Sequence, residues 1–271
     1  MPKTVACIIA RTVSTRLPLK VLRDLEPNIN MLDFIIERLK KVNSIDVIYI
    51  CTSFEPVDDI LEDVANRHDV KIYRGGTDDV IERMVNVSDM ENAEITIRIT
   101  GDNPLTSFEY IDNQVDFLVN GKLDYVRLTD VPIGATAEVI KTKALIDCYN
   151  KMDKSVSEYL MLFLFEPMNY KCGIIKVTPE DYSQYTVTVD TPIDLERTKY
   201  LLNNIPHTSP SEIKLRNILQ IYDSKNSEVP AMKIAFSGSV KLPYDKIDTF
   251  ENFMKDMERR KNNSEKLEMY G

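Results

Sequence analysis

The sequence predicts an α/β fold with a mostly parallel central sheet and helices on both faces. Its 271 residues are enough for one large domain of this class with a modest extension. Over residues 1–120, short apolar runs alternate with segments of helical periodicity, which is typical of a parallel sheet covered by helices. The apolar runs lack polar alternation, which indicates strands that are buried on both faces.

Each strand–helix unit follows from its local pattern. The strands are apolar runs, whereas the helices repeat apolar residues three or four positions apart, as at Leu32, Ile35, Ile36 and Leu39. The predicted strands are Thr4–Ala10, Asp46–Thr52, Val70–Tyr73 and Ile95–Thr100. The predicted helices are Leu32–Lys41, Val57–His68, Asp78–Val87 and Ser107–Val119.

Beyond residue 120 the pattern is mixed rather than parallel, and from Asn203 the composition becomes more polar. The expected strands are Asp124–Thr129, Ala137–Lys141, Lys171–Val177 and Tyr185–Asp190. The expected helices are Lys143–Lys151, Val156–Phe165, Pro192–Leu202, Ser211–Tyr222 and Lys246–Glu268, with a short strand-like piece at Lys233–Phe236 between the last two. We therefore expect a main domain over residues 1–202 and a mostly helical extension over residues 203–271. The charged last helix suits a solvated surface, with a dimer contact as the alternative.

The bulk composition disfavours several functional classes. A net charge of −9 argues against a general nucleic-acid binder, and the apolar runs are far shorter than the roughly 20 residues of a membrane span. The N-terminus lacks the pattern of a secretory signal, so we expect a cytoplasmic protein. With only two histidines, a histidine-based zinc site and a Ser-His-Asp triad are disfavoured. The four scattered cysteines suit buried, reduced thiols.

Three cations stand within ten residues after the first predicted strand. They are Arg11, Arg16 and Lys20, and the loop that holds them also carries hydroxyls but no acid. The loop after a strand of a parallel sheet lies at the carboxyl edge, where ligands bind. In an acidic chain this local excess predicts a polyphosphate site, with a solvated basic turn as the alternative. The loop lacks the glycine pattern of a Walker A motif.

Two aspartates follow predicted strands at the same edge. Asp102 comes just after the strand Ile95–Thr100, and Asp190 precedes a helix that begins at Pro192. Two carboxylates, together with phosphate oxygens and water, suit Mg²⁺, which prefers oxygen ligands and takes few of them from protein. Taken alone, each aspartate also fits a turn or a helix cap.

The loop Ala10–Lys20 reads A-R-T-V-S-T-R-L-P-L-K and resembles the opening signature of the GT-A-fold cytidylyltransferases, A-R-x-x-S-T-R-L-P-x-K. That superfamily includes the synthetases of CMP-ketodeoxyoctonate and CMP-acylneuraminate, and the spore-coat polysaccharide group, which this chain resembles most. Further motifs follow in the family's order over residues 4–202. They are R-G-x-x-D-D-V at Arg74–Val80, R-I-T-G-D-x-P-L at Arg98–Leu105, P-x-G before Glu138, and T-V-D-T-P-x-D-L at Thr188–Leu195.

The resemblance implies a Rossmann-like GT-A nucleotidyltransferase fold and a cytidylyltransferase activity. Such an enzyme transfers CMP from CTP to a small acidic acceptor, here a sugar acid, a phosphonate or a phosphorylated compound, and releases pyrophosphate. The residues implied to contact CTP are Ala10, Arg11, Ser14, Thr15, Arg74, Arg98 and Gly101. The implied catalytic residues are Arg16, Lys20, Asp102 and Asp190, of which the two aspartates hold Mg²⁺. Glu138 is implied to contact the acceptor, and we expect a homodimer.

The chain also departs from the family pattern. Val13 and Leu19 stand where many members have glycine, and Thr136 stands where an acid is usual. Ser157–Leu160 replaces a frequent E-H-V-T, which indicates a different acceptor. Two alternatives remain: a GT-A glycosyltransferase, which would normally carry an Asp-x-Asp motif, and a non-catalytic nucleotide-binding module.

Overall fold

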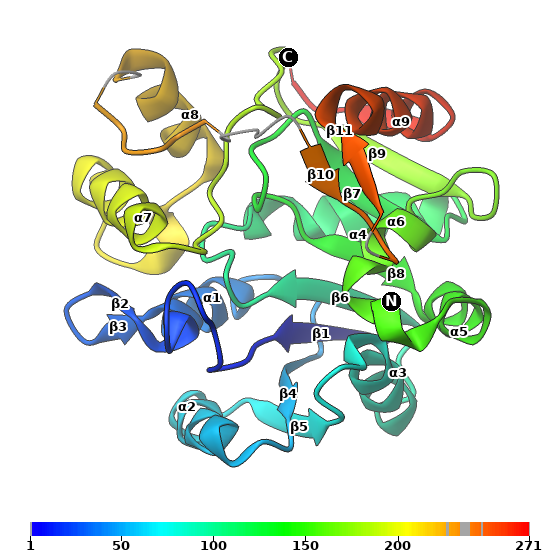
Figure 1. Ribbon diagram of the computed structural model, residues 1–271, viewed down its shortest axis with the longest axis horizontal. Helices are drawn as coiled ribbons and strands as arrows, with labels where there is room; N and C mark the ends of the chain where they lie inside the picture. Colours follow the sequence, from blue (N-terminus) through cyan, green and yellow to red (C-terminus); the bar gives the residue numbers. More distant parts are fainter. Residues whose placement is uncertain (1, 226–227, 234–238, 245, 271) are drawn as a thin grey trace.

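The computed structural model describes residues 2–225, 228–233, 239–244 and 246–270. Its centre is an eight-stranded sheet in the order β12-β9-β7-β8-β6-β1-β4-β5 (Figure 1). The strands are β1 (Thr4–Ile9), β4 (Val47–Ser53), β5 (Lys71–Gly75), β6 (Ile95–Thr100), β7 (Tyr125–Thr129), β8 (Glu138–Lys141), β9 (Cys172–Lys176) and β12 (Glu265–Glu268). Strand β8 runs antiparallel to β6 and β7, and all other neighbours in this sheet pair in parallel. The predicted, mostly parallel sheet is confirmed.

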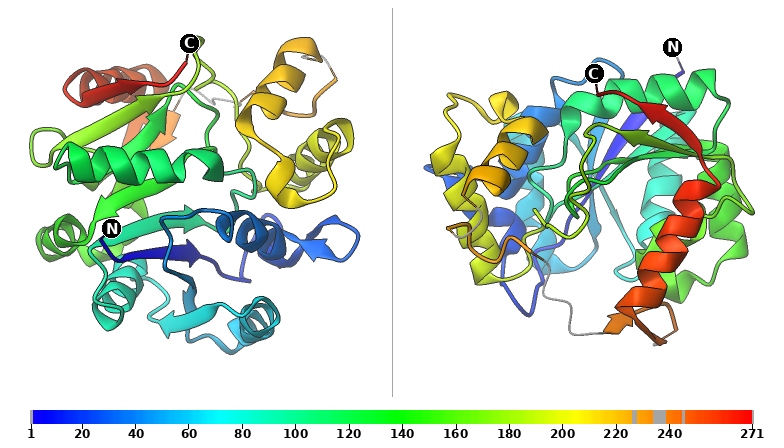
Figure 2. Two further views of the ribbon diagram at one scale, coloured as in Figure 1. Left: turned by 180° about the vertical axis from the view of Figure 1, so that it is seen from behind. Right: turned by 90° about the horizontal axis from the view of Figure 1, so that it is seen from above.

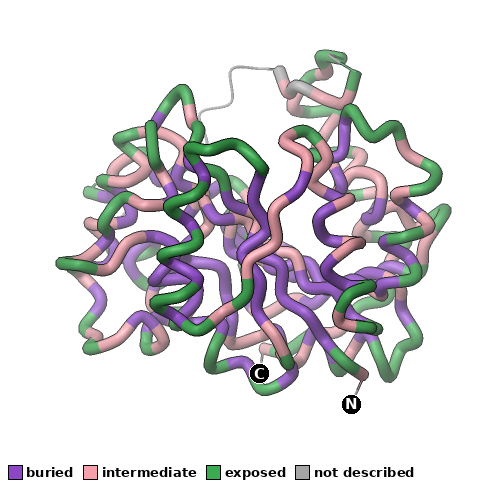
Figure 3. The backbone as a smooth tube through the Cα atoms, turned by 90° about the horizontal axis from the view of Figure 1, so that it is seen from below, coloured by how far each residue is buried: buried purple, intermediate pink, exposed green. Residues whose placement is uncertain are grey.

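Helices cover both faces of this sheet (Figure 2). Along β1, Ala6 and Ile8 belong to one apolar cluster, whereas Val5 and Cys7 belong to another. The first cluster includes side chains of α1 (Met31–Leu39), α2 (Ile60–His68) and α4 (Ile111–Asn120). The second includes side chains of α3 (Val80–Met90), α5 (Thr142–Lys151) and α6 (Leu160–Leu164). Figure 3 shows the central strands as largely buried, as their unbroken apolar runs predict.

The first four strand–helix units lie close to their predicted bounds. The hairpin of β2 (Asp24–Glu26) and β3 (Ile29–Asn30) was not predicted. Short 3₁₀ helices occupy Lys20–Leu22 (η1), Pro56–Asp58 (η2), Phe108–Tyr110 (η3), Lys154–Tyr159 (η4) and Pro210–Glu212 (η5). The predicted helix Val156–Phe165 is therefore divided between η4 and α6.

The predicted strand Tyr185–Asp190 is wrong. Within the described part of the chain, this segment forms only isolated bridges, between Thr186 and Ile133 and between Tyr185 and Lys233. It is held in an extended course by separate backbone bonds, because Val187 N donates to Ile133 O at 2.8 Å and Val189 N donates to the carbonyl of Asp102 at 2.8 Å. The segment thus crosses the loops at the sheet edge rather than joining the sheet.

The predicted helix Lys246–Glu268 is wrong at both ends. It divides into β11 (Ile247–Thr249), which pairs with β10 (Ser239–Lys241), then α9 (Phe250–Asn262) and β12. The Thr249 side chain caps α9 by accepting from Asn252 N, and β12 pairs with β9 at the edge of the main sheet. Arg260 of α9 is buried and donates to the carbonyls of Leu162 and Phe165, so this charged helix is not wholly solvated.

The remaining helices, α7 (Pro192–Asn204) and α8 (Leu215–Ser224), add side chains to the first apolar cluster. Residues 203–271 therefore contribute strands as well as helices, and β12 completes the sheet of the main domain. The predicted boundary near residue 202 stays a prediction. The strand-like piece predicted at Lys233–Phe236 lies, beyond Lys233, outside the described residues. All four cysteines are buried and unpaired, as predicted.

Candidate active site

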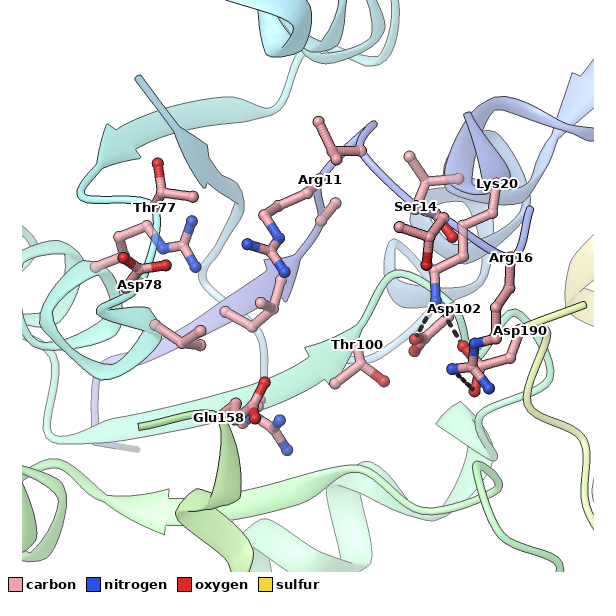
Figure 4. A pocket seen from close by; sticks show the side chains of 18 of the residues that line it. Arg11, Ser14, Arg16, Lys20, Thr77, Asp78, Thr100, Asp102, Glu158 and Asp190 are labelled. Carbon is pink, nitrogen blue, oxygen red and sulfur yellow. Dashed lines mark hydrogen bonds and ion pairs between the residues drawn. The ribbon is translucent and has the colours of Figure 1, made fainter. Parts of the chain in front are cut away.

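A cavity of about 590 Å³ opens at the carboxyl ends of β1 and β6 (Figure 4). One end gathers Arg16, Lys20, Asp102 and Asp190, whereas Thr77 and Asp78 lie at the other end. Of the residues predicted to contact CTP, those that line this cavity are Ala10, Arg11, Ser14, Thr15 and Arg98. The structure therefore brings together most of the predicted site from three separate segments of the chain.

Lys20 bridges the two predicted metal-binding aspartates. Its Nζ lies 2.8 Å from Asp102 Oδ2 and 2.8 Å from Asp190 Oδ1, and Arg16 Nη2 lies 3.1 Å from Asp190 Oδ2. Burial alone would lower the pKa of the Lys20 ammonium, but the charges and hydrogen bonds of both carboxylates outweigh it and raise that pKa. Lys20 is therefore held in its charged form, and the carboxylates of Asp102 and Asp190 both point toward its ammonium group.

The cationic loop is anchored from below by Asp58. This buried carboxylate accepts from the backbone N of Thr12 at 2.8 Å and from its hydroxyl at 2.6 Å. The hydroxyls of Thr52 and Ser53 donate to its other oxygen at 3.0 and 2.5 Å. Burial would raise the pKa of Asp58, but these hydrogen bonds outweigh it and lower the pKa. The first turn of the loop is thereby fixed to the end of β4.

Leu19 sets the direction in which Lys20 leaves the loop. It has φ 54°, in the left-handed region, and its N donates to Thr12 O at 3.1 Å. Glycine adopts this conformation without steric cost, whereas other residues do so rarely. The position at which many relatives carry glycine is thus a turn that needs positive φ, and this chain makes the same turn with leucine.

Asp190 is held by the start of α7. Asp194 Oδ2 accepts from the backbone N of Asp190 at 3.1 Å and from that of Thr191 at 2.8 Å. Arg197 in turn donates to Asp194 Oδ1 at 2.7 Å and to the carbonyls of Thr188 and Ala231. The pKa of Asp194 would be raised by burial, but it is lowered because these groups hydrogen-bond to the carboxylate. Asp190 therefore projects from a rigid backbone.

Gly101 lies beneath the cavity rather than in its lining. A Cβ at this position would meet Ala10 Cβ at 3.0 Å and Ile9 O at 3.1 Å. Its N donates to Ile9 O at 2.8 Å, which holds the ends of β1 and β6 together. Gly101 thus permits the close approach of the two strands that present Ala10 and Asp102.

Arg74, predicted to contact CTP, lies outside the cavity. It forms ion pairs with Asp59 at 2.6 Å and Glu62 at 2.9 Å, and it donates to the carbonyls of Ser53 and Glu55 at 3.0 Å. These partners belong to the segment from the end of β4 into α2, and they hold the guanidinium beside it. The structure therefore does not support the predicted contact with CTP.

Glu138, predicted to contact the acceptor, is buried. Its carboxylate pairs with Arg98 and accepts from Tyr125 Oη at 2.5 Å. Burial would raise its pKa, but the cationic Arg98 and Arg127 outweigh burial and lower it. Glu138 therefore pairs with Arg98, which does line the cavity, whereas Glu138 itself does not line it.

The sequence interpretation missed several lining residues, including Thr77, Asp78, Arg83 and Glu158. Arg83 is the informative omission, because it sits among the apolar positions of α3, next to Met84 and one turn from Val87. A cation on the buried face of an amphipathic helix is a sequence signal for a special role. Ser157, where relatives carry another residue, accepts from Val80 N and donates to Asp78 O, so it holds the loop before α3.

A family model described as cytidylyltransferase matches residues 5–233. The chain belongs to the cytidylyltransferase family. An uncharacterized protein of Methanocaldococcus jannaschii is 32% identical over 231 residues, which cover 84% of this chain and 93% of that protein. The spore coat polysaccharide biosynthesis protein SpsF of Bacillus subtilis is 32% identical over 218 residues, with 76% of this chain and 90% of that protein covered. The predicted family and enzyme class, a nucleotidyltransferase, are confirmed.

Solved structures share the fold. A cytidylyltransferase from Leptospira borgpetersenii superposes with a TM-score of 0.78 at 24% identity, covering 86% of this chain and 99% of that one. A CMP:2-keto-3-deoxy-manno-octonic acid synthetase in complex with CTP superposes with a TM-score of 0.58 at 18% identity, covering 74% and 98%. The Rossmann-like nucleotidyltransferase fold is thereby confirmed. Among the described residues, no helix is both long and apolar enough to cross a bilayer.

Proposed function

We propose that this protein transfers CMP from CTP to a small acidic acceptor and releases pyrophosphate. The single observation that carries the proposal is the convergence of Lys20 with Asp102 and Asp190 in a cavity that also holds Arg11 and Arg16. Cations suit a triphosphate, and paired carboxylates suit the metal that accompanies it. Membership of the cytidylyltransferase family supports this interpretation.

The donor set fits Mg²⁺. Asp102 and Asp190 each place an oxygen 2.8 Å from one cationic atom, Lys20 Nζ, so a single ion can reach both carboxylates. Among the described residues no group of three or more His, Cys, Asp or Glu forms a complete protein site, so phosphate and water would supply the other ligands. Asp102 and Asp190 would hold the ion, which supplies Lewis-acid charge beside the phosphates.

The reaction is then a direct displacement at the α-phosphorus of CTP. An acceptor oxygen attacks the α-phosphorus of CTP, and the bond from that phosphorus to pyrophosphate breaks. Arg16 and Lys20 neutralise the charge that develops on the departing pyrophosphate. An acceptor that is already an oxyanion needs no general base, and this is the reason for preferring an acidic acceptor.

The acceptor lies among sugar acids, phosphonates and phosphorylated compounds. The Bacillus subtilis relative is described as a spore coat polysaccharide biosynthesis protein, which supports a sugar acid. Glu158 lines the cavity where relatives often have histidine, which supports an acceptor that differs from theirs. The homodimer and the cytoplasmic location stay predictions.

The test is a pyrophosphate-release screen of CTP, UTP, ATP and GTP, each with Mg²⁺ and a panel of these acceptors. We expect release with CTP and one acceptor class, and a CMP conjugate in the mass spectrum. Equal efficiency with CTP and UTP would contradict the base assignment. Release of a nucleoside diphosphate from a sugar nucleotide would instead show a glycosyltransferase.

A further inference from the structure

Arg83 is a buried arginine whose guanidinium has no hydrogen-bond partner among the described residues. The three largest fully buried side chains are those of Arg38, Arg83 and Arg197. Arg38 donates to three backbone carbonyls, and Arg197 donates to one carboxylate and two carbonyls. By contrast, Nε, Nη1 and Nη2 of Arg83 find no hydrogen-bond partner within the described part of the chain. Two of these arginines thus fasten the fold, and the third does not.

An unsatisfied guanidinium is costly to bury, because it loses water and gains nothing in return. Burial lowers the pKa of Arg83, and Asp58 and Asp79 act on it only through their charge, without a hydrogen bond. The chain also makes room for it: a Cβ at Gly75 would lie 2.6 Å from Arg83 Cγ. Since Arg83 borders the cavity, a ligand bound there can supply the missing acceptors.

The position of Arg83 favours the base of the nucleotide over its phosphates. Lys20, Asp102 and Asp190 mark the phosphate end, whereas Thr77 and Asp78 lie at the opposite end (Figure 4). Arg83 lines the same cavity from α3, which begins two residues after Asp78. A guanidinium donates two parallel N–H groups, which match two adjacent acceptors. Cytosine presents that pair, its ring N3 and the neighbouring carbonyl O2. Uracil has an N–H at N3, which would face a donor.

We propose that Arg83 reads the base by donating to N3 and O2 of cytosine, and so makes the site select CTP over UTP. This inference rests on the proposed function and adds the residue that enforces base choice. With uracil, the donor that faces N3–H is left unpaired while the other can still reach O2, and a buried unpaired donor discriminates more strongly than shape alone. The bound nucleotide would supply these donors with acceptors.

The first test compares catalytic efficiency with CTP and UTP in Arg83→Met and Arg83→Lys. Loss of charge-assisted hydrogen bonds should lower the CTP-to-UTP ratio about tenfold to a hundredfold in Arg83→Met. Arg83→Lys keeps the charge but loses the planar fork, so it should also lose selectivity. Arg216→Met, which removes an exposed arginine of α8, should keep the ratio of the unmodified protein.

The second test measures thermal stability, which separates a ligand contact from a structural one. We expect Arg83→Met without nucleotide to be at least as stable as the unmodified protein, because it removes an unpaired buried charge. The rise in Tm caused by CTP should shrink in the variant. A merely structural arginine would give the reverse: a clear fall in Tm and an unchanged response to CTP.

Gly75→Ala provides a variant that leaves the guanidinium in the protein. Its added methyl group would collide with Arg83 Cγ and displace the side chain, so the CTP-to-UTP ratio should fall here too. If the unmodified protein prefers CTP and all three variants keep that preference, the role of Arg83 is refuted and the proposed function stands. If the unmodified protein does not prefer CTP, the result contradicts the proposed function itself, because that proposal names CTP as the substrate.

Discussion

The ammonium of Lys20 lies 2.8 Å from the carboxylate of Asp102, although 82 positions separate them in the sequence. The parallel pairing of β1 with β6 explains this approach, because it places the residues after the two strands at one edge. Gly101 permits the strand ends to come close. The pair is thus a direct product of the fold, and it defines the end of the cavity at which we place the reaction.

Asp102→Ala and Asp190→Ala should each abolish turnover, measured as pyrophosphate release, and EDTA should abolish it in the unmodified protein. Each variant removes one of two oxygens that face a common cation position. Circular dichroism should show the fold retained. Asp59→Ala, which removes an exposed acid that pairs with Arg74 outside the cavity, serves as the control. Full activity in EDTA or in either site variant would refute the metal assignment.

Lys20→Ala and Arg16→Ala should weaken CTP binding about tenfold to a hundredfold, as loss of a charge-assisted phosphate contact predicts. Turnover should fall as well, since these groups neutralise the leaving pyrophosphate. Isothermal titration calorimetry measures the affinity. Arg216→Ala, outside the cavity on α8, should bind CTP like the unmodified protein. Unchanged affinity in both loop variants would contradict the phosphate assignment.

Local patterns predicted most elements because the spacing of apolar residues in a segment reflects which of its side chains are buried. The strand Ile95–Thr100 is one of these, and it has the bounds that were predicted. Segments whose form depends on distant partners were not recoverable. Glu265–Glu268 has a weak strand pattern of its own and becomes a strand only by pairing with β9. Tyr185–Asp190 has the sequence pattern of a strand, but the described loops beside it form only isolated bridges with it.

The residues of the candidate site also fall into those that the sequence predicts and those that it does not. The cationic loop and Asp102 follow from their places after strands. Asp190 was expected at the same edge because of a predicted strand that the structure does not form. The bond from Val189 N to the carbonyl of Asp102 and the contact with Asp194 place it there instead. The direction of a long side chain does not follow from such a place. Arg74 and Arg83 are nine positions apart, yet the first turns toward Asp59 and Glu62, and the second borders the cavity. Only the packing of β5 and α3 decides which arginine serves the site.

Leu19→Gly should stabilise the protein by about 1 kcal/mol, because a left-handed backbone costs a non-glycine residue roughly that amount. The Leu19 side chain is 48% exposed, so its removal sacrifices little packing. Urea denaturation measures the change, and activity should be retained because Lys20 keeps its position. Leu19→Ala keeps a Cβ in the same conformation and should show no gain. Destabilisation by glycine would indicate that leucine packs on something more than the loop.

The anchor at Asp58 should make stability depend on pH. Because hydrogen bonds from Thr12, Thr52 and Ser53 lower its pKa, its contribution is complete above the ordinary aspartate value near 3.9 and is lost as the pH falls through the lowered pKa. Asp58→Asn should therefore be less stable than the unmodified protein at pH 7, and the difference should shrink below about pH 4. Urea midpoints measured from pH 7 to pH 2.5 test this directly. A deficit that stays constant across that range would show that shape, and not the charge of Asp58, fixes the loop.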